Sequence, residues 1–299
     1  MSETPASPPP PTVDTSAIRE IAKDVYAILD RRVPLVPNIG IVLGATKALV
    51  IDTGMGSQNG RAVLETAKRL AGAREIILTI THFHPEHGYG AEPFKGVAKI
   101  VYNKVQADEF ADKGQGYLDM FKGMGPSVAE TLADTALVTA DELYDGDEHV
   151  IDLGGRVAIL KTWGKAHTRG DQIVYLPDEN ILFTGDLAEE KTFPIFPWFP
   201  PDDMNIDGAN WLKVLDACLA LQPRIIVPGH GEIGDAAILG DVRDYIADVE
   251  ARVKPAVAAG KTDDEMIAEL SPIIKAQHPD WHFPEWIDFA IRYFSAQQA

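Results

Sequence analysis

The chain has 299 residues, of which 45% are hydrophobic and 24% are charged, as is usual for soluble globular proteins. We expect a chain of this length to bury about 75% of its unfolded surface in one or two hydrophobic cores. Its 45 acidic and 27 basic residues give a net charge of −18, which repels phosphate backbones and argues against nucleic acid as a partner. No apolar run approaches the roughly 20 residues that span a membrane, so we expect no membrane partner.

Residues 1–15 are rich in proline, serine and threonine, with four consecutive prolines at 8–11. This composition predicts a disordered tail ahead of one domain at 16–299. The start has neither basic residues nor an apolar run, so it does not resemble a signal peptide. The sequence as written therefore predicts a cytoplasmic protein, with the periplasm as the alternative if a signal peptide has been removed.

Three short apolar segments follow the tail, and each predicts a strand, at 25–29, 39–43 and 48–51. The third leads through the sequence DTG at 52–54 into a helix predicted at 60–70. Residues 76–80 are apolar or β-branched, and this short run predicts a buried strand.

The polar sequence THFHPEHG at 81–88 begins where this buried strand ends. Side chains two residues apart point to the same face of an extended chain, so His82 and His84 can bind one metal ion. A turn at the proline can then direct Glu86 and His87 toward a second ion. Zinc and similar divalent ions prefer imidazole and carboxylate ligands, so this cluster favours a metal site over isolated structural histidines.

The pattern His-x-His-x-Glu-His after an apolar strand resembles the signature of the metallo-β-lactamase-fold hydrolases, normally His-x-His-x-Asp-His. Glu86 replaces the family's aspartate, and its extra methylene would displace or loosen the second metal ion. Asp52 is a second point of resemblance, because the family has such an aspartate beneath the metals. A carboxylate there would accept the second N–H of a ligating imidazole. A helix N-cap or a turn is the alternative role for Asp52, and the two roles have equal weight.

Residues 104–136 have a helical pattern that glycines interrupt, which predicts several short helices in an inserted, mobile segment. Such a segment could act as a lid over the site. Met120, Phe121 and Met124 would then contact an apolar substrate, or they would pack the insert against the core. His149 follows in an acidic strand region, where we expect an exposed side chain and no metal ligand.

Three polar residues later in the chain repeat the arrangement of a ligand beside an apolar strand. His167 lies in a glycine-containing turn before the predicted strand at 172–176. Asp186 directly follows a strand, where a turn aspartate is the alternative, and His230 follows another strand in the sequence PGHG. Distant strands can deliver ligands to one place only if their ends converge on one edge, so we expect these residues to meet there.

The sequence FPIFPWFPPDD at 193–203 contains too many prolines for a regular helix. We interpret it as an aromatic wall of a substrate pocket, with a stiff loop on the core or an oligomer contact as alternatives. The chain ends in helices at about 236–299, and His278 and His282, between the last two, are expected to be structural. Cys218 is the single cysteine, which excludes an intrachain disulfide, and we expect it to be buried in a helix.

The resemblance covers about residues 25–231, with five matching segments in the family's order. It implies an α/β fold, an αββα sandwich of two mixed β-sheets flanked by helices, with metals at one edge. It also implies that three histidines hold one metal, a carboxylate and two histidines hold the other, and Asp186 bridges the two. The ligands of the first metal would be His82, His84 and His167. The ligands of the second would be Glu86, His87 and His230, and Asp52 would accept a hydrogen bond from a ligating imidazole.

This resemblance implies a metal-dependent hydrolase in which metal-bound hydroxide attacks the carbonyl of a small ester, lactone, β-lactam or thioester. Glu86 and Asp186 are the expected catalytic carboxylates. Zinc is the expected metal, two ions per chain, or one if Glu86 is a general base and not a ligand. A mononuclear iron oxygenase of sulfur compounds and a non-catalytic binding protein are the alternatives on the same fold. The expected partner is a small carbonyl compound, and homo-oligomers are left open.

Overall fold

The computed structural model describes residues 9–298 of the chain. It divides into two compact units, an N-terminal unit, Met1–Leu160, and a C-terminal unit, Lys161–Ala299. Within the described residues, no helix combines the length and the apolar character that a membrane crossing requires.

The main sheet of the N-terminal unit has seven strands that lie side by side in chain order, β1 to β7. Neighbours are antiparallel from β1 to β4 and parallel from β4 to β7, so the sheet is mixed. The strands are β1 Ile18–Ala22, β2 Val25–Ile28, β3 Ile39–Leu43, β4 Lys47–Ile51, β5 Glu75–Thr79, β6 Lys99–Asn103 and β7 Glu142–Tyr144. In β4 and β5, Ile51 lies opposite Thr79. Asp52 and the segment at 80–88 therefore leave the sheet at the same edge.

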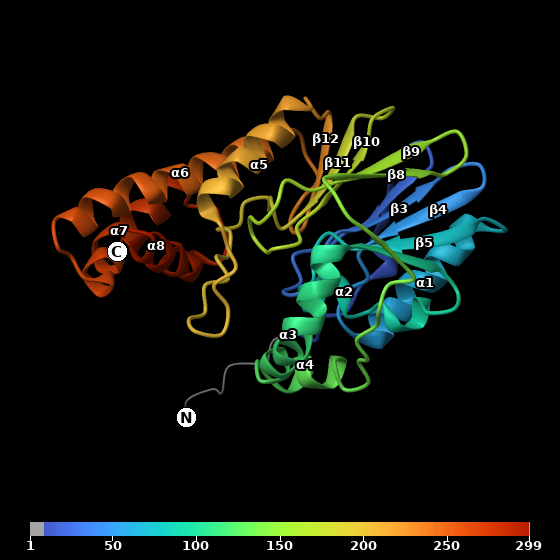
Figure 1. Ribbon diagram of the computed structural model, residues 1–299, viewed down its shortest axis with the longest axis horizontal. Helices are drawn as coiled ribbons and strands as arrows, with labels where there is room; N and C mark the ends of the chain where they lie inside the picture. Colours follow the sequence, from blue (N-terminus) through green and yellow to red (C-terminus); the bar gives the residue numbers. More distant parts are fainter. Residues whose placement is uncertain (1–8, 299) are drawn as a thin grey trace. The chain divides into compact units, whose positions relative to one another are not determined.

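Helix α1, Gly56–Ala71, connects β4 to β5 and packs against the central strands of this sheet (Figure 1). It buries Val63, Leu64 and Ala67 in a core shared with apolar residues of β3, β4 and β5. Positions three and four apart lie on one face of a helix, so these residues form a continuous apolar stripe.

The described part of the chain begins at residue 9, within the tail predicted at 1–15. Pro11 and Val13 are buried. The Asn59 side chain of α1 donates to the Pro11 carbonyl at 2.7 Å and accepts from the Val13 N–H at 2.9 Å. A short 3-10 helix at Thr15–Ala17 follows. The proline run at 8–11 begins outside the described residues, as does the rest of the expected tail at 1–7.

The segment at 104–136 forms a long helix, α3 Lys104–Lys122, and a short one, α4 Pro126–Thr131. The expectation that Gly114 breaks the helix is wrong. A Cβ at Gly114 would lie 2.8 Å from Leu137 Cδ1, and Tyr89 donates to the Gly114 carbonyl at 2.9 Å, so this glycine allows close packing inside a continuous helix.

The three side chains of this segment that were proposed to contact substrate, Met120, Phe121 and Met124, differ in burial. Phe121 is buried in an apolar cluster with Met55, Phe83 and Tyr89, so the packing alternative holds for it. Met120 and Met124 are 39% and 52% exposed.

The last strands of the N-terminal unit are β8 Glu148–Asp152 and β9 Val157–Lys161. His149 on β8 is partly exposed, and its ring stacks on Tyr144 with 4.9 Å between centroids. Its Nε2 lies 3.5 Å from Glu142 Oε1. These contacts give His149 a structural place at the surface.

The second sheet has the strand order β12-β11-β10-β9-β8. The C-terminal unit contributes β10 Ile173–Leu176, β11 Ile181–Gly185 and β12 Ile225–Pro228. Strands β10 and β11 are antiparallel, and β11 and β12 are parallel, so this sheet is also mixed. The chain thus has the two mixed sheets that the sequence predicted.

Four helices form the rest of the C-terminal unit (Figure 1), namely α5 Gly208–Ala220, α6 Ala237–Ala258, α7 Asp263–Gln277 and α8 Ile287–Ala296. Trp211 and Leu215 of α5 share a core with Ile173, Leu182 and Ile226 of the strands. The last three helices lie within the expected region, 236–299. A capping box formed by Thr262 and Glu265 begins α7.

Cys218 lies on the buried side of α5, as expected for a small apolar residue. Burial raises the pKa of its thiol to about 12, because the thiolate loses its hydration. The thiol is therefore neutral and unreactive at physiological pH.

The aromatic loop at 193–203 is mostly packed into the C-terminal unit. Phe193 is fully buried against Tyr245 and Trp281, and Phe196 is fully buried against Trp211 and Tyr293. The interpretation as a pocket wall is therefore wrong for these two rings, because both are fully buried in the apolar core of the unit.

The remaining aromatic residues of the loop, Trp198 and Phe199, are partly exposed. The ring of His278 packs against Trp281 at a tilt of 39°, with 4.1 Å between ring centroids, in keeping with the structural role expected for it.

Candidate metal centre

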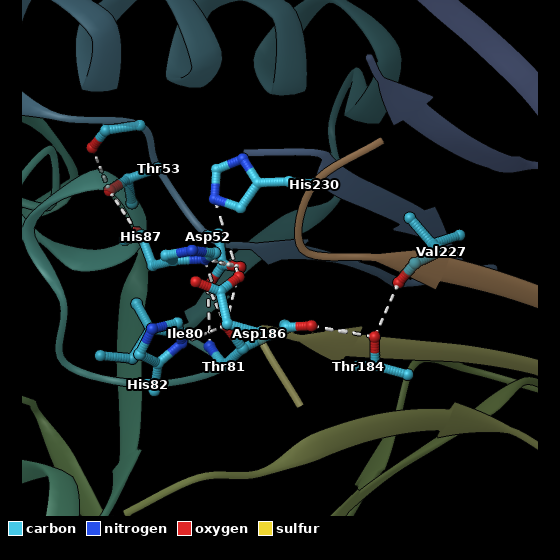
Figure 2. A network of polar contacts seen from close by, with 12 residues as sticks. Asp52, Thr53, Ile80, Thr81, His82, His87, Thr184, Asp186, Val227 and His230 are labelled. Carbon is cyan, nitrogen blue, oxygen red and sulfur yellow. Dashed lines mark hydrogen bonds and ion pairs between the residues drawn. The ribbon is translucent and has the colours of Figure 1, made fainter. Parts of the chain in front are cut away.

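A buried aspartate holds the segment that contains the histidine cluster. Asp52 Oδ1 accepts from the Thr81 N–H at 2.7 Å, and Oδ2 accepts from Thr81 Oγ1 at 2.9 Å. Oδ2 also accepts from His87 Nδ1 at 2.9 Å (Figure 2). A carboxylate only accepts, so His87 carries its proton on Nδ1 and directs Nε2, with its lone pair, away from Asp52.

The two roles that the sequence left open for Asp52 can now be compared. The N-cap residue of helix α1 is Met55, so Asp52 does not cap that helix. Asp52 has a φ of 68°, a left-handed conformation that is uncommon for residues other than glycine, although aspartate and asparagine adopt it more readily than most. Such conformations persist where neighbouring interactions fix them, and here hydrogen bonds from Thr81 and His87 fix the Asp52 side chain.

The histidine cluster surrounds a single helical turn, α2 Pro85–Gly88, which begins with the proline that was expected to turn the chain. His82 and His84 have ligand atoms within 4.8 Å of each other, and the same holds for Glu86 and His87. All four side chains are buried. Three imidazoles and one carboxylate gathered in this way form a donor set that suits zinc.

The alternation of side chains along 82–84 is also as expected for an extended chain. Phe83 is fully buried in the apolar cluster with Tyr117 and Phe121 of α3. The ring of His84 stacks on Tyr117, with 5.3 Å between centroids and 21° between planes. Phe83 therefore anchors the segment between its two histidines.

In the C-terminal unit, His167 lies on a loop that hydrogen bonds hold on both sides. Asp171 accepts from the Thr168 N–H at 2.8 Å and from Thr168 Oγ1 at 2.6 Å. Asn210 of α5 donates to the carbonyls of Trp163 and Lys165, both at 2.9 Å. The loop before and after His167 is thus fixed by side chains of the same unit.

The ring of His167 is fully buried and contacts the edge of Trp211, with 5.3 Å between centroids. Sequence reasoning missed Asp171, Asn210 and Trp211. Asn210 stands in the first turn of a helix, and nothing in its sequence neighbourhood indicates a contact 45 residues away.

Asp186 follows the last residue of β11 and faces the imidazoles of His167 and His230 with different oxygens. Figure 2 shows it beside His230. Its Oδ2 lies 4.0 Å from His167 Nε2, and its Oδ1 lies 3.7 Å from His230 Nε2. Both distances are too long for a hydrogen bond. They are shorter than about 4.2 Å, the largest separation of two ligands that are each about 2.1 Å from one zinc ion. The carboxylate therefore has the geometry to share a cation with each histidine.

Gly229, in the sequence PGHG, allows this arrangement because it has no side chain. A Cβ at this position would lie 1.9 Å from Asp186 Oδ1. The Gly229 N–H donates to the Gly185 carbonyl at 3.0 Å. Thr184 Oγ1, drawn with Val227 in Figure 2, donates to the Gly185 carbonyl at 2.9 Å. The ends of β11 and β12 are thus packed too closely for any larger residue.

Residues 32–230 match the family model of the metallo-beta-lactamase superfamily. The chain belongs to this superfamily. Its members bind metal ions, typically zinc, and the histidine and aspartate groups described above could hold such an ion.

Superfamily relatives with different activities are similar to this chain. The linear primary-alkylsulfatase of Pseudomonas sp. (strain ATCC 19151) is 25% identical over 256 residues, which are 74% of this chain and 47% of that protein. The metallo-beta-lactamase type 2 of Bacillus cereus is 26% identical, over 71% of this chain and 73% of the relative. The acyl-coenzyme A thioesterase MBLAC2 of Homo sapiens is 28% identical, over 64% of this chain and 72% of the relative. The chain thus spans about half the length of the alkylsulfatase.

Solved structures of the superfamily share the fold. The sec-alkylsulfatase Pisa1 from Pseudomonas sp. has a TM-score of 0.72 at 17% identity, over 94% of this chain and 50% of that chain. The DIM-1 metallo-beta-lactamase exposed to ceftazidime has a TM-score of 0.62 at 16% identity, over 80% of this chain and 99% of that chain. The predicted fold class, two mixed sheets flanked by helices, is confirmed.

Proposed function

We propose that this superfamily member is a metal-dependent hydrolase with two zinc ions per chain. The ligands that we propose are His82, His84, Glu86, His87, His167, Asp186 and His230. The observation that carries the proposal is the placement of the Asp186 oxygens at 4.0 and 3.7 Å from two different imidazoles. A carboxylate that faces two imidazoles in this way is arranged to bridge two cations.

The residues fit zinc by their chemistry. Five imidazoles and two carboxylates provide three or four ligands for each of two ions, as zinc sites require. His87 already donates its Nδ1 proton to Asp52, which is the arrangement that orients ligating histidines. The orienting bond fixes the tautomer that a metal ligand needs.

Bound zinc supplies a Lewis acid and lowers the pKa of a coordinated water to about 7. The protein's part is to hold the ligands rigid and to shield them from bulk water. Six of the seven proposed ligands are buried, and His230 is partly exposed. His230 therefore marks the side from which a substrate would reach the metals.

Glu86 keeps a place in the proposed ligand set although it is longer than the family's aspartate. Its carboxylate lies within 4.8 Å of the His87 ring nitrogen, so the extra methylene does not carry it away from the cluster. We assign Glu86 to the second metal as a ligand. Metal analysis of the purified protein tests this, because a single equivalent would leave Glu86 as a general base.

We propose a small carbonyl compound as the substrate, in the class of esters, lactones, β-lactams and thioesters. Two of the similar proteins are named for such chemistry, a β-lactamase and an acyl-coenzyme A thioesterase. Alkyl sulfate esters are the second candidate, because the alkylsulfatase similarity extends over 256 residues, compared with 217 for the β-lactamase.

The test is a set of hydrolysis assays with nitrophenyl esters, an acyl thioester, a chromogenic cephalosporin and an alkyl sulfate. We expect one class to be hydrolysed, activity to disappear on thorough chelation, and zinc to restore it. Hydrolysis that survives both chelation and His84→Ala would refute the proposal. Oxygen consumption with bound iron would instead support the oxygenase alternative.

A further inference from the structure

The buried side chain of Gln106, on helix α3, binds the backbone that leads into the histidine cluster. Its Nε2 donates to the carbonyl of Ile80 at 3.0 Å and to the carbonyl of Thr81 at 3.1 Å. Gln106 is completely buried. Both donors of the amide are therefore used on two consecutive carbonyls just before His82.

The same side chain closes the N-terminus of α3. Asn103 Oδ1 accepts from the Gln106 N–H at 2.7 Å, and Gln106 Oε1 accepts from the Asn103 N–H at 3.1 Å, which is a capping box. Strand β6 is the parallel neighbour of β5, with Ile100 opposite Leu78. The start of α3 therefore lies at the sheet edge where the histidine segment begins.

Capping alone does not explain a glutamine at this position. A glutamate closes a capping box equally well, because the box requires only an acceptor at the third helical residue. A carboxylate cannot donate to the Ile80 and Thr81 carbonyls, whereas an amide can. The two carbonyls therefore account for glutamine in place of glutamate.

The hydrogen bonds fix two successive peptide groups. The peptide between Ile80 and Thr81 is held at its carbonyl by Gln106 and at its N–H by Asp52. The next peptide, which joins Thr81 to His82, is held at its carbonyl by Gln106. Rotation of these peptides would turn the Cα–Cβ bond of His82, so holding them sets the direction of its imidazole.

We propose that Gln106 is a positioning residue that sets the metal affinity of the histidine cluster by fixing the backbone at Thr81 and His82. The proposal rests on the proposed function, since it requires that the cluster binds zinc. It gives helix α3 a part in metal binding that differs from the lid predicted from the sequence. The Tyr117 ring on the same helix, stacked on His84, provides a second contact of α3 with the cluster.

The test measures zinc affinity by competition with a chromophoric chelator, and thermal unfolding of the metal-free protein, in matched variants. Gln106→Glu keeps the capping acceptor and removes the donors, and Gln106→Met removes both while filling the space. Gln115→Glu is the same substitution on an exposed part of α3, and Asn103→Ala removes the capping side chain alone.

We expect both Gln106 variants to raise the zinc dissociation constant by roughly 10- to 100-fold, as for other residues that orient metal ligands. Gln115→Glu and Asn103→Ala should change it less than about twofold, although Asn103→Ala should lower the unfolding temperature. A cobalt-substituted Gln106→Met protein should also show an altered visible spectrum, because the ligand geometry changes.

Unchanged zinc affinity in the Gln106 variants, with a fall in unfolding temperature like that of Asn103→Ala, would overturn the proposal and leave Gln106 a capping residue. If Gln106→Glu does not fold, Gln106→Met decides the question. An unaltered protein that does not bind zinc would refute the proposed function itself, and this result is distinct from equal binding by all variants.

Discussion

The two sets of candidate ligands are built in different ways. In the N-terminal unit the four residues fall within 82–87. The segment is held by hydrogen bonds that the Asp52 side chain accepts and the Gln106 side chain donates. In the C-terminal unit the three ligands lie on separate loops. Side-chain hydrogen bonds hold the loop of His167, and close backbone packing at Gly229 holds Asp186 and the neighbouring His230. The first set should therefore respond to polar substitutions, and the Asp186 and His230 pair should respond to added volume.

The largest effect is expected where one residue serves both metals. Asp186→Ala removes the carboxylate that faces His167 and His230, so we expect activity to fall more than about 10³-fold, or about 4 kcal/mol of transition-state stabilisation. Zinc content should fall below two equivalents. The control is Asp178→Ala, an exposed aspartate of the same unit. If Asp186→Ala keeps two zinc ions and full activity, Asp186 does not bridge them.

Added volume in the C-terminal set is tested by Gly229→Ala. The new methyl group would lie 1.9 Å from Asp186 Oδ1, so the carboxylate must move or the strands must separate. We expect a loss of about 1–3 kcal/mol in the free energy of unfolding and at least about a 10-fold loss of activity. Chemical denaturation and steady-state kinetics measure the two effects.

The matched control is Gly240→Ala, in the interior of α6, where an added Cβ meets nothing within 4 Å. This substitution should leave activity unchanged and stabilise the helix by up to about 1 kcal/mol. Equal behaviour of the two variants would show that close packing at Gly229 does not hold the C-terminal ligands.

A polar substitution tests the N-terminal set. Asp52→Asn keeps the shape and the positive φ, which asparagine tolerates, but it leaves one acceptor oxygen for Thr81 and His87. We expect zinc affinity to fall roughly 10- to 100-fold. The control is Asp147→Asn, an exposed aspartate of the same unit. Unchanged affinity would mean that the bond from His87 to Asp52 does not orient the ligand.

Sequence reasoning was most successful where the information is local. The alternation of His82, Phe83 and His84 follows from strand geometry, and the structure has Phe83 buried and the two histidines close together. The two mixed sheets were predicted through the family resemblance, because strand patterns alone do not determine topology.

Contacts between residues that are distant in the chain could not be predicted from the sequence. The choice between two roles for Asp52 depends on the parallel register of β4 and β5, which no local pattern reveals. Gln106 looks like an ordinary capping residue until the Ile80 carbonyl is seen beside it. The glycine at 114 was taken for a helix break because its close contact with Leu137 depends on tertiary packing.

The smallest effect is expected at the point where this chain departs from the family pattern. Glu86→Asp restores the family's aspartate but shortens a side chain whose carboxylate already lies within 4.8 Å of the His87 ring nitrogen. Because α2 holds the backbone at that position, we expect the second zinc to bind roughly 3- to 10-fold more weakly, and the first to be unaffected. Sequential zinc titration separates the two ions, and Glu65→Asp, at an exposed position of α1, is the control.

Tighter binding of the second zinc in Glu86→Asp would contradict the expected loss of affinity and show that the backbone suits the shorter residue. The backbone around the N-terminal ligands would then fit an aspartate better than the glutamate that is present, whereas the backbone beside Asp186 fits the glycine at 229.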